Sequence, residues 1–447
     1  MPLRAPSQGL EGYRIPGRRV RAKALVGNFT AAFLGFGLLL SSPPAELRNL
    51  LQVPLVGSYQ LSLFELALIP ICLGIFLRRK LHIEKHEQPL FLSVALLFGT
   101  RVLSLLLARN VVPEQAFSTF RYVETFVVLL VMAALFSDST RRAFFFKGVV
   151  AGVILESLAG FWSFLASGGI QRGFWLGVDN FRLQVYLLII CSLLLLTNKR
   201  QWKPLAYSLA LLLALLATQT RAVVPLLTVV LILGVLLWGR RYIRPVLIYC
   251  GWILFVVPAA LVLFPELTQQ THVRVQQVFK QESAIKHRLV LIEMAGIAFF
   301  ENPVTGIGSG GFARQQITLY RKAQQTIPWD YRTLNPVGAH NLILGTAAET
   351  GSVGLLAYFL WMLAVIRICL RATRLSMRRM AEKSALYTAG AALTVIGLTL
   401  SDWWGQSSFT LIATFLLAFV LGWMRENKVL LAREEAHTSS RRVARFG

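Results

Sequence analysis

His340 and Asn341 stand where a long polar stretch leads into an apolar run long enough to cross a membrane. A neutral imidazole can take a proton from a hydroxyl group near neutral pH, so a histidine at this boundary could act as a general base. The alternative is a histidine with a structural role only. His272 and His287 have no metal-ligand spacing with His340, so these histidines do not predict a metal site.

Two arginines are candidates for binding an anionic group. Arg221 stands in the short polar connection 218–221 between two apolar runs, and Arg288 opens a mostly apolar stretch beside Lys286 and His287. The planar guanidinium forms bidentate bonds and stays charged, so arginine suits a diphosphate better than lysine does. The structural alternatives are snorkelling to lipid phosphates for Arg221 and a solvated charge cluster for Arg288.

Glycine-rich segments flank the histidine, at 306–311 and at 349–354. Glycine permits the close backbone approach that an anion needs, and it is equally expected in a tight turn. No strand–helix unit surrounds the first segment, so it is not a dinucleotide-binding fingerprint. The candidate substrate-binding residues of this region are Asn341, Gly306, Gly308 and Glu349.

The aspartates of the sequence form no Asp-x-Asp pair of the kind that holds a divalent cation in many glycosyltransferases. Aspartate occurs only at Asp138, Asp179, Asp330 and Asp402, and no Asp-x-Asp pair is present. An enzyme that acts on a diphosphate without such a pair must neutralise the leaving group with cationic side chains. We therefore expect chemistry that uses neither a metal nor another cofactor, with the two arginines in that role.

The elements that must position these residues are membrane helices. The composition is 55% hydrophobic and the mean hydropathy is +0.59, well above a soluble globular chain. We expect an all-α polytopic membrane protein of about twelve transmembrane helices, forming one integral membrane domain over 1–447. The apolar runs lie near 24–42, 60–77, 89–108, 120–136, 145–166, 181–197, 204–219, 221–238, 245–264, 342–368, 384–401 and 407–424.

The distribution of basic residues predicts the orientation. The net charge is +25, but Lys and Arg come in short bursts between apolar runs, as topogenic charges do, and not along one face as nucleic-acid binding requires. Alternate connections are basic, which places both termini in the cytoplasm. The outer side then receives the large segment 265–341 between the ninth and tenth spans, with Ser309 expected to be accessible from outside.

The large outer segment is expected to contain short helices. Its stretch 288–300 is mostly apolar but too short to span a bilayer, so it should lie in the interface or in a cavity. Pro303 should end it, because proline cannot continue a helix.

Charged residues inside the apolar runs are costly unless they are paired or face a wet cavity. Arg101 could form a buried structural pair with Glu65 or Glu156. Such residues also suit a secondary transporter, the alternative from a different class of protein. The residues concerned are Arg101, Glu65, Glu124, Glu156 and Glu349.

The order of the polar motifs resembles the signature region of the O-antigen ligase and polymerase family of bacterial membrane glycosyltransferases. The resemblance covers mainly residues 215–360, and the layout of many spans agrees with it over the whole chain. An arginine of the outer loop belongs to the pattern, and Arg288 or a neighbouring basic residue corresponds to it. The other matching pieces are Thr218-Gln219-Thr220-Arg221, Asn302 to Gly308, His340-Asn341 and Glu349 to Gly354.

The resemblance implies a GT-C-like helical fold in the bacterial inner membrane and a glycan donor linked to undecaprenyl diphosphate. It implies metal-independent, inverting transfer of the glycan to an acceptor hydroxyl on the periplasmic face. His340 would act as the base, and Arg221 and Arg288 would stabilise the departing diphosphate.

Members of the family differ in their acceptor. Ligases use lipid A-core, polymerases use another lipid-linked glycan, and some oligosaccharyltransferases use protein Ser/Thr. We expect an O-antigen ligase of lipopolysaccharide biosynthesis, with an O-antigen or exopolysaccharide polymerase as the alternative. A secondary transporter is disfavoured, because the two halves of the chain show no repeat and the 78–88 connection lacks a transporter motif.

Overall fold

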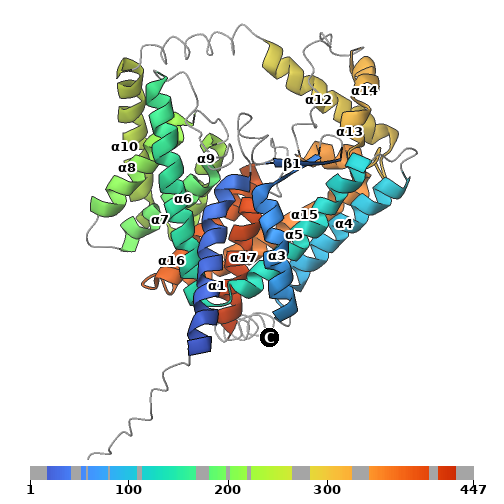
Figure 1. Cartoon of the computed structure of the whole chain (residues 1–447). Helices are drawn as coiled ribbons and strands as arrows, with labels where there is room; N and C mark the ends of the chain where they lie inside the picture. Colours follow the sequence, from blue (N-terminus) through green and yellow to red (C-terminus); the bar gives the residue numbers. More distant parts are fainter. Residues whose placement is uncertain are drawn as a thin grey trace, which may run out of the picture.

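The computed structural model is a bundle of helices with a further group of helices at one end (Figure 1). The structure describes residues 18–41, 52–56, 59–78, 81–107, 113–167, 181–197, 202–218, 223–263, 282–324, 342–401 and 411–428. Each apolar run of the sequence has a helix at its position. The bundle helices are α1 (Arg18–Gly37, followed by the 3-10 turn η1, Leu38–Ser41), α3 (Leu63–Arg78), α4 (Gln88–Leu107), α5 (Pro113–Leu135), α6 (Ser139–Ala166), α7 (Phe181–Thr197), α8 (Trp202–Ala217), α9 (Val223–Trp238), α10 (Arg240–Leu263), α15 (Leu342–Met377), α16 (Lys383–Ser401) and α17 (Leu411–Glu426).

Several of the described helices suit a membrane by their length and composition. The four that are long and apolar enough to cross one are Gln88–Leu107, Ser139–Ala166, Leu342–Met377 and Lys383–Leu400. Shorter apolar helices accompany them, and large apolar side chains are exposed on many of these elements, as on a surface that faces lipid chains. The prediction of a helical membrane protein is therefore confirmed, while the number of spans stays a prediction.

A short antiparallel hairpin, β1 (Gln52–Val56) with β2 (Tyr59–Ser62), departs from the all-α prediction. Its second strand runs directly into α3, and Ser62 caps that helix. The Glu65 carboxylate accepts hydrogen bonds from the Ser62 N–H (2.7 Å) and hydroxyl (2.9 Å), while the Glu65 N–H donates to Ser62 Oγ (3.1 Å). This reciprocal pattern is a capping box, which satisfies backbone groups at the start of the helix.

Glycines allow α1 and α6 to pack with their backbones close together. A Cβ on Gly35 would lie within 3.0 Å of the Phe145 carbonyl oxygen, and a Cβ on Gly148 within 3.0 Å of the Ala32 carbonyl oxygen. Crossings through small residues are typical of membrane helices, whose association depends on van der Waals contact.

Hydroxyl groups inside the bundle bind carbonyls of their own helices. Each donates to the carbonyl four residues earlier, so the hydroxyl is satisfied without water. This pattern is found at Ser192, Ser208, Thr350, Thr373, Thr388, Thr394 and Thr399.

Ion pairs hold the end of the bundle at which α17 finishes. Arg425 forms two hydrogen bonds with the Glu87 carboxylate, at 2.7 and 2.8 Å, and both side chains are buried. Arg142 pairs with Glu426 and also donates to the Phe136 carbonyl oxygen (2.5 Å). These contacts join α17 to the starts of α4 and α6.

The connection between α3 and α4 lies at this same end and carries two perturbed groups. Burial lowers the pKa of His86, whose Nε2 has no hydrogen-bond partner among the described residues and lies 4.0 Å from the Glu87 carboxylate. Burial alone would raise the pKa of Glu84, but hydrogen bonds from Lys428 (2.5 Å) and His82 outweigh it, so the pKa of Glu84 is lowered. The end of α17 therefore holds this connection in place.

The second group of helices lies at the end of the molecule opposite to the end of α17 (Figure 1). It consists of α12 (Glu282–Glu301), α13 (Gly311–Arg314) and α14 (Gln316–Ala323). The end of α12 just before Pro303 agrees with the sequence prediction. These helices share a separate apolar core with the start of α15, made by Val290, Leu291, Met294, Ala295, Ala298, Ile307, Phe312, Leu319, Tyr320, Ala323 and Ala348.

Candidate functional site

The structure describes only some of the predicted site residues. His340, Asn341 and Arg221 lie outside the described residues. Arg288 belongs to α12, and its backbone alone is described. The remaining three, Gly306, Gly308 and Glu349, are described, and they meet at one point between α12, α15 and α4.

The connection from α12 to α13, residues 302–310, is a tight turn that we name the glycine turn. The backbone angle φ is 68° at Gly306, 98° at Gly308 and 72° at Gly310, in the region that glycine adopts without steric cost. Gly306 also touches α15, since a Cβ there would lie within 3.0 Å of the Glu349 backbone. Glycine is therefore required here by conformation and by packing.

The helix α15 consists of two segments. Gly351 has φ 65° and ψ −162°, which is not helical, so residues 342–350 form a leading segment ahead of the long remainder. Just past this break, the Ser352 N–H donates to the Pro303 carbonyl oxygen (2.8 Å). A Cβ on Gly351 would collide with the Val304 carbonyl. The glycine turn therefore packs against α15 at the position of the break.

The glycine turn caps the leading segment of α15. The Ile307 N–H donates to the Ala348 carbonyl oxygen (2.9 Å), and the Gly308 N–H donates to the Glu349 carbonyl oxygen (3.1 Å). The last carbonyls of a helix have no partners within that helix, so these two bonds satisfy groups that the break would otherwise leave open. The same bonds fix the end of the leading segment relative to α12.

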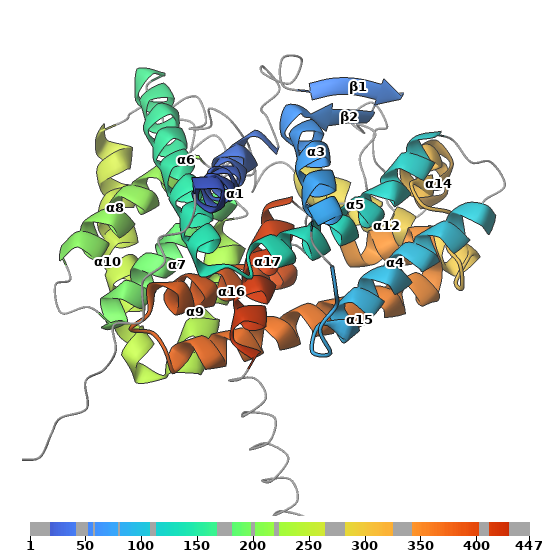
Figure 2. The same ribbon diagram turned by 60° about the horizontal axis from the view of Figure 1, so that its bottom comes forward.

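Arg101 of α4 reaches this junction from the bundle, where α4 lies alongside α15 (Figure 2). Its Nη1 donates to Glu349 Oε2 (2.6 Å) and to Ser309 Oγ (3.2 Å). The guanidinium carbon lies 5.1 Å from the centre of the Tyr122 ring, and the Thr119 hydroxyl donates to Ser309 Oγ (3.1 Å). We refer to Arg101, Ser309 and Glu349 as the Arg101 cluster.

The partner of Arg101 differs from the expectation. The sequence left Glu65 or Glu156 as candidates, whereas Arg101 binds Glu349 and Glu65 caps α3. An arginine within a membrane helix is costly, and a carboxylate partner offsets that cost. Ser104 adds a second link from α4, because its hydroxyl donates to the Glu349 carbonyl oxygen (2.5 Å).

Ser309 is fully buried, so the expectation that it is accessible from outside was wrong. Its hydroxyl is used inside the protein, between Arg101 and Thr119. A polar, glycine-rich sequence gave no sign that this hydroxyl would face the bundle.

The helix that carries Arg288 packs directly on the leading segment of α15. Leu291 and Met294, within two turns of Arg288, share a buried core with Ala348. Leu344 packs against the same core from the beginning of the leading segment. This shared core fixes α12 and the leading segment of α15 to each other. Both are close in sequence to predicted catalytic residues, since Arg288 lies on α12 and His340 precedes the leading segment by two residues.

A comparison with protein families tests the resemblance. Residues 206–359 match the family model described as O-antigen ligase. This part of the chain is similar to the O-antigen ligase family, which supports the resemblance seen in the sequence. The family supports a transferase role and, in general, glycan and lipid-linked substrates. No curated protein matches the chain.

The region of the O-antigen ligase match contains every predicted site residue. It runs from α8 into α15 and so includes Arg221, α12, the glycine turn and the leading segment. Arg101, Ser104 and Tyr122 lie outside it, on α4 and α5. The cluster thus joins the family region to helices of the first third of the chain.

The described residues contain no group of three His, Cys, Asp or Glu side chains that could hold a metal ion. Metal independence stays a prediction, since part of the chain lies outside the described residues.

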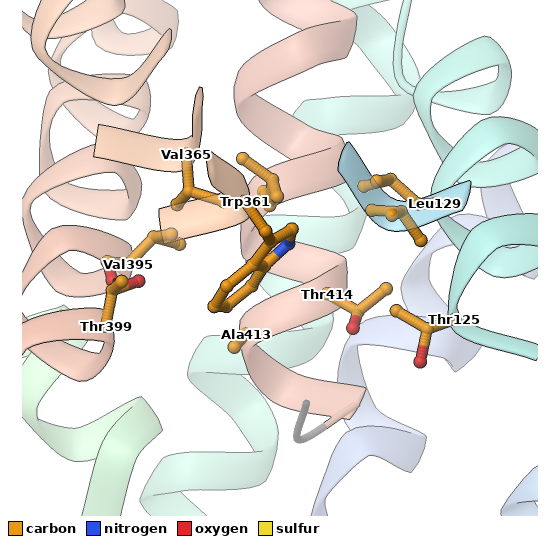
Figure 3. Close-up of a pocket in the computed structure, with 10 residues that line it drawn as sticks. Thr125, Leu129, Trp361, Val365, Val395, Thr399, Ala413 and Thr414 are labelled. Atoms are coloured by element: carbon orange, nitrogen blue, oxygen red, sulfur yellow. The ribbon is translucent and has the colours of Figure 1, made fainter. Parts of the chain in front are cut away.

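A small apolar pocket lies deeper in the bundle, with the Trp361 indole pointing into it (Figure 3). Val94 on its wall precedes Arg101 by seven residues of α4, about 10 Å along a helix. No charged side chain lines it, so it offers no group for acid–base chemistry. The lining residues are Val94, Thr125, Leu129, Trp361, Val365, Val395, Thr399, Ala413, Thr414 and Leu417.

Sequence reasoning missed the residues of α4 and α5 that contact Arg101, Ser309 and Glu349 at this junction. Ser104, Thr119 and Tyr122 are ordinary residues of apolar helices and carry no motif. The junction could have been predicted from two opposite charges within apolar runs, Arg101 and Glu349. Opposite charges inside membrane helices are expected to pair.

Proposed function

We propose that the protein is an O-antigen ligase, a GT-C-like enzyme of the bacterial inner membrane that acts in lipopolysaccharide biosynthesis. It transfers a glycan from undecaprenyl diphosphate to a hydroxyl of lipid A-core on the periplasmic face, without a metal. The observation that carries this proposal is the family match over 206–359, which contains all the residues assigned to the reaction. Both termini lie in the cytoplasm, and the segment 265–341 lies in the periplasm.

The proposed reaction is a single displacement at the anomeric carbon of the donor sugar. The acceptor hydroxyl attacks from the face opposite to the diphosphate, and His340 takes the hydroxyl proton. The new glycosidic bond forms as the carbon–oxygen bond to the diphosphate breaks, so the configuration inverts. Undecaprenyl diphosphate leaves with the bonding electrons, and Arg221 and Arg288 stabilise its negative charge.

The proposed substrate-binding residues divide into two kinds. Asn341 contributes a side-chain amide beside the base. Gly306 and Gly308 have their N–H groups bound within the protein, to Asn302 and Glu349, and the Glu349 carboxylate is bound to Arg101. In this proposal, Gly306, Gly308 and Glu349 shape the wall of the site, and the charged contacts to the substrate come from the arginines.

The packing of α12 on the leading segment of α15 supports this assignment. Both bordering elements share one core, so a base just before Leu342 and an arginine on α12 can keep a constant relation to each other. Fixed geometry of this kind is what a displacement reaction requires, because its barrier depends on alignment of the reacting groups.

The test is an assay with purified protein in lipid nanodiscs and a defined undecaprenyl-diphosphate-linked glycan. Lipid A-core and a second lipid-linked glycan are offered separately as acceptors, and products are separated by gel electrophoresis. Glycan-bearing lipid A-core supports the ligase. Elongation of the second lipid-linked glycan alone would identify a polymerase. Uptake of the glycan into sealed vesicles without transfer to either acceptor would identify a transporter.

A further inference from the structure

The Arg101 cluster joins three segments that are far apart in the sequence. Arg101 lies 208 residues from Ser309 and 248 residues from Glu349. Both hydrogen bonds are charge-assisted, the one to Glu349 is short (2.6 Å), and Arg101 is only 8% exposed. Such bonds are directional as well as strong. A contact of this kind can hold one backbone segment in a single place.

The segment held by this contact is the leading segment of α15. Its last residues are bound by the Glu349 carboxylate to Arg101, by the Glu349 carbonyl to Ser104 and Gly308, and by the Ala348 carbonyl to the glycine turn. Past this point the helix is broken at Gly351. The break separates the leading segment from the rest of α15, so its position depends on the bonds at its end and on its packing against α12.

The beginning of the leading segment borders the proposed base, since His340 precedes Leu342 by two residues. We propose that Arg101 and Glu349 are positioning residues for glycosyl transfer, and that their ion pair sets the place of the leading segment and so of His340. The inference rests on the proposed function. Neither residue touches the reacting atoms, and both act through the helix that the histidine precedes.

The variants must separate positioning from mere stability. Arg101→Met leaves the partly buried Glu349 carboxylate without its partner, and Glu349→Met leaves the buried Arg101 guanidinium without its partner, so both should lower the melting temperature. The double variant Arg101→Met/Glu349→Met leaves no such charge, and its melting temperature should return toward that of the wild type. Its turnover should nevertheless stay reduced by roughly 10–100-fold, because a displacement on the order of 1 Å at a reacting group has this effect.

Two further measurements identify positioning. The Michaelis constant for the donor should stay within a few-fold of wild type, because Arg221 and Arg288 are intact. The acid limb of the pH–rate profile should also be retained, since the base is still present, whereas His340→Ala should remove it. Glu349→Asp keeps the charge but shortens the side chain by one methylene, so it should lower turnover at near-normal stability. This variant carries the test if the others fail to fold.

The control is an ion pair at the other end of the bundle, between the buried Arg142 and the exposed Glu426. Arg142→Met/Glu426→Met removes an arginine–carboxylate pair that is remote from the glycine turn. Its turnover per folded molecule should equal that of the wild type. Recovery of turnover together with stability in Arg101→Met/Glu349→Met would overturn the inference, as would unchanged turnover in both single variants and in Glu349→Asp.

Amide hydrogen exchange provides a readout that needs no activity. In Arg101→Met/Glu349→Met, amides of residues 342–350 should exchange faster, while those of α16 should not change. Unchanged exchange in 342–350 would also overturn the inference. Absence of transfer by the wild-type protein would instead refute the proposed function, so the two failures are distinguishable.

Discussion

Gly306 and Gly351 lie on the two sides of the contact between the glycine turn and α15, and neither position has room for a side chain. A Cβ on Gly306 would collide with the backbone of Glu349, and a Cβ on Gly351 would collide with the backbone of Val304. Both residues also have positive φ, at 68° and 65°. Each glycine is therefore required twice, once for the conformation of its own segment and once for the approach of the other.

Gly306→Ala and Gly351→Ala should each destabilise the protein. Left-handed strain alone costs about 1–3 kcal/mol, and the collision with the facing backbone adds to it. The melting temperature in detergent and the transfer rate should both fall. Gly296→Ala in α12 is the control, because a Cβ there has no atom within 4 Å and alanine favours a helix. Equal melting temperatures for Gly306→Ala and Gly296→Ala would contradict this account.

His340→Ala should lower turnover by roughly 10²–10⁴-fold, the usual contribution of a general base, and leave donor binding largely intact. Arg221→Ala and Arg288→Ala should reduce both donor affinity and turnover, because they remove charge from the diphosphate. Lysine should rescue either arginine poorly, since it lacks the planar fork. Transfer rates and donor binding are measured with one defined donor. Full activity in His340→Ala would remove the base assignment, and full activity in Arg221→Ala would leave that residue with a role in lipid contact.

The orientation of the chain can be tested with single cysteines in a Cys250→Ser background, because Cys250 is exposed. Val304 is 58% exposed in the glycine turn, and Arg378 is exposed after α15. Basic connections stay in the cytoplasm, so a membrane-impermeant maleimide should label Val304→Cys in intact cells and label Arg378→Cys only after lysis. Ser309→Cys should react slowly both in intact cells and after lysis, because this position is buried. Labelling of Arg378→Cys in intact cells would reverse the orientation.

Transfer should continue in excess EDTA, because the sequence lacks an Asp-x-Asp pair and the proposed leaving group is neutralised by arginines. The measurement is the rate of the purified enzyme before and after chelation. A rate that disappears and returns on addition of Mg²⁺ or Mn²⁺ would show that a carboxylate site had been missed.

His86 should make the protein less stable in mild acid. Burial lowers its pKa in the folded state, so the unfolded chain binds more protons as the pH falls through about 6.5, and stability falls with it. In His86→Asn, the decrease in melting temperature between pH 7 and pH 5 should be smaller. His82→Asn, on the same connection but exposed, is the control and should keep the decrease. The same slope in His86→Asn and wild type would exclude this role.

The helices of the bundle could be predicted from the sequence because membrane helices are coded locally, by runs of apolar residues. The end of α12 could be predicted for the same reason, from Pro303. The partner of Arg101 could not, since Glu349 lies 248 residues away and two nearer carboxylates fit the same rule. The capping role of Glu65 was missed because the motif from Ser62 to Glu65 was counted as part of a span.

A tight turn was one of the roles expected for the glycines at 306–311, but the contact of this turn with α15 was not predicted. A glycine pattern indicates a turn without indicating what lies against it. The predicted roles of His340, Arg221 and Arg288 stay predictions, supported by motif order and by the family match over 206–359.

The pair Glu87–Arg425 has a consequence for the synthesis of the protein. Glu87 stands at the start of α4, and the arginine that neutralises it is made 338 residues later, at the end of α17. While the ribosome adds those residues, the carboxylate lacks this partner, so the contact can close only after α17 has been made. A chain shortened before Arg425 would leave the buried Glu87 carboxylate without this arginine, and a buried charge that loses its partner is strongly destabilising.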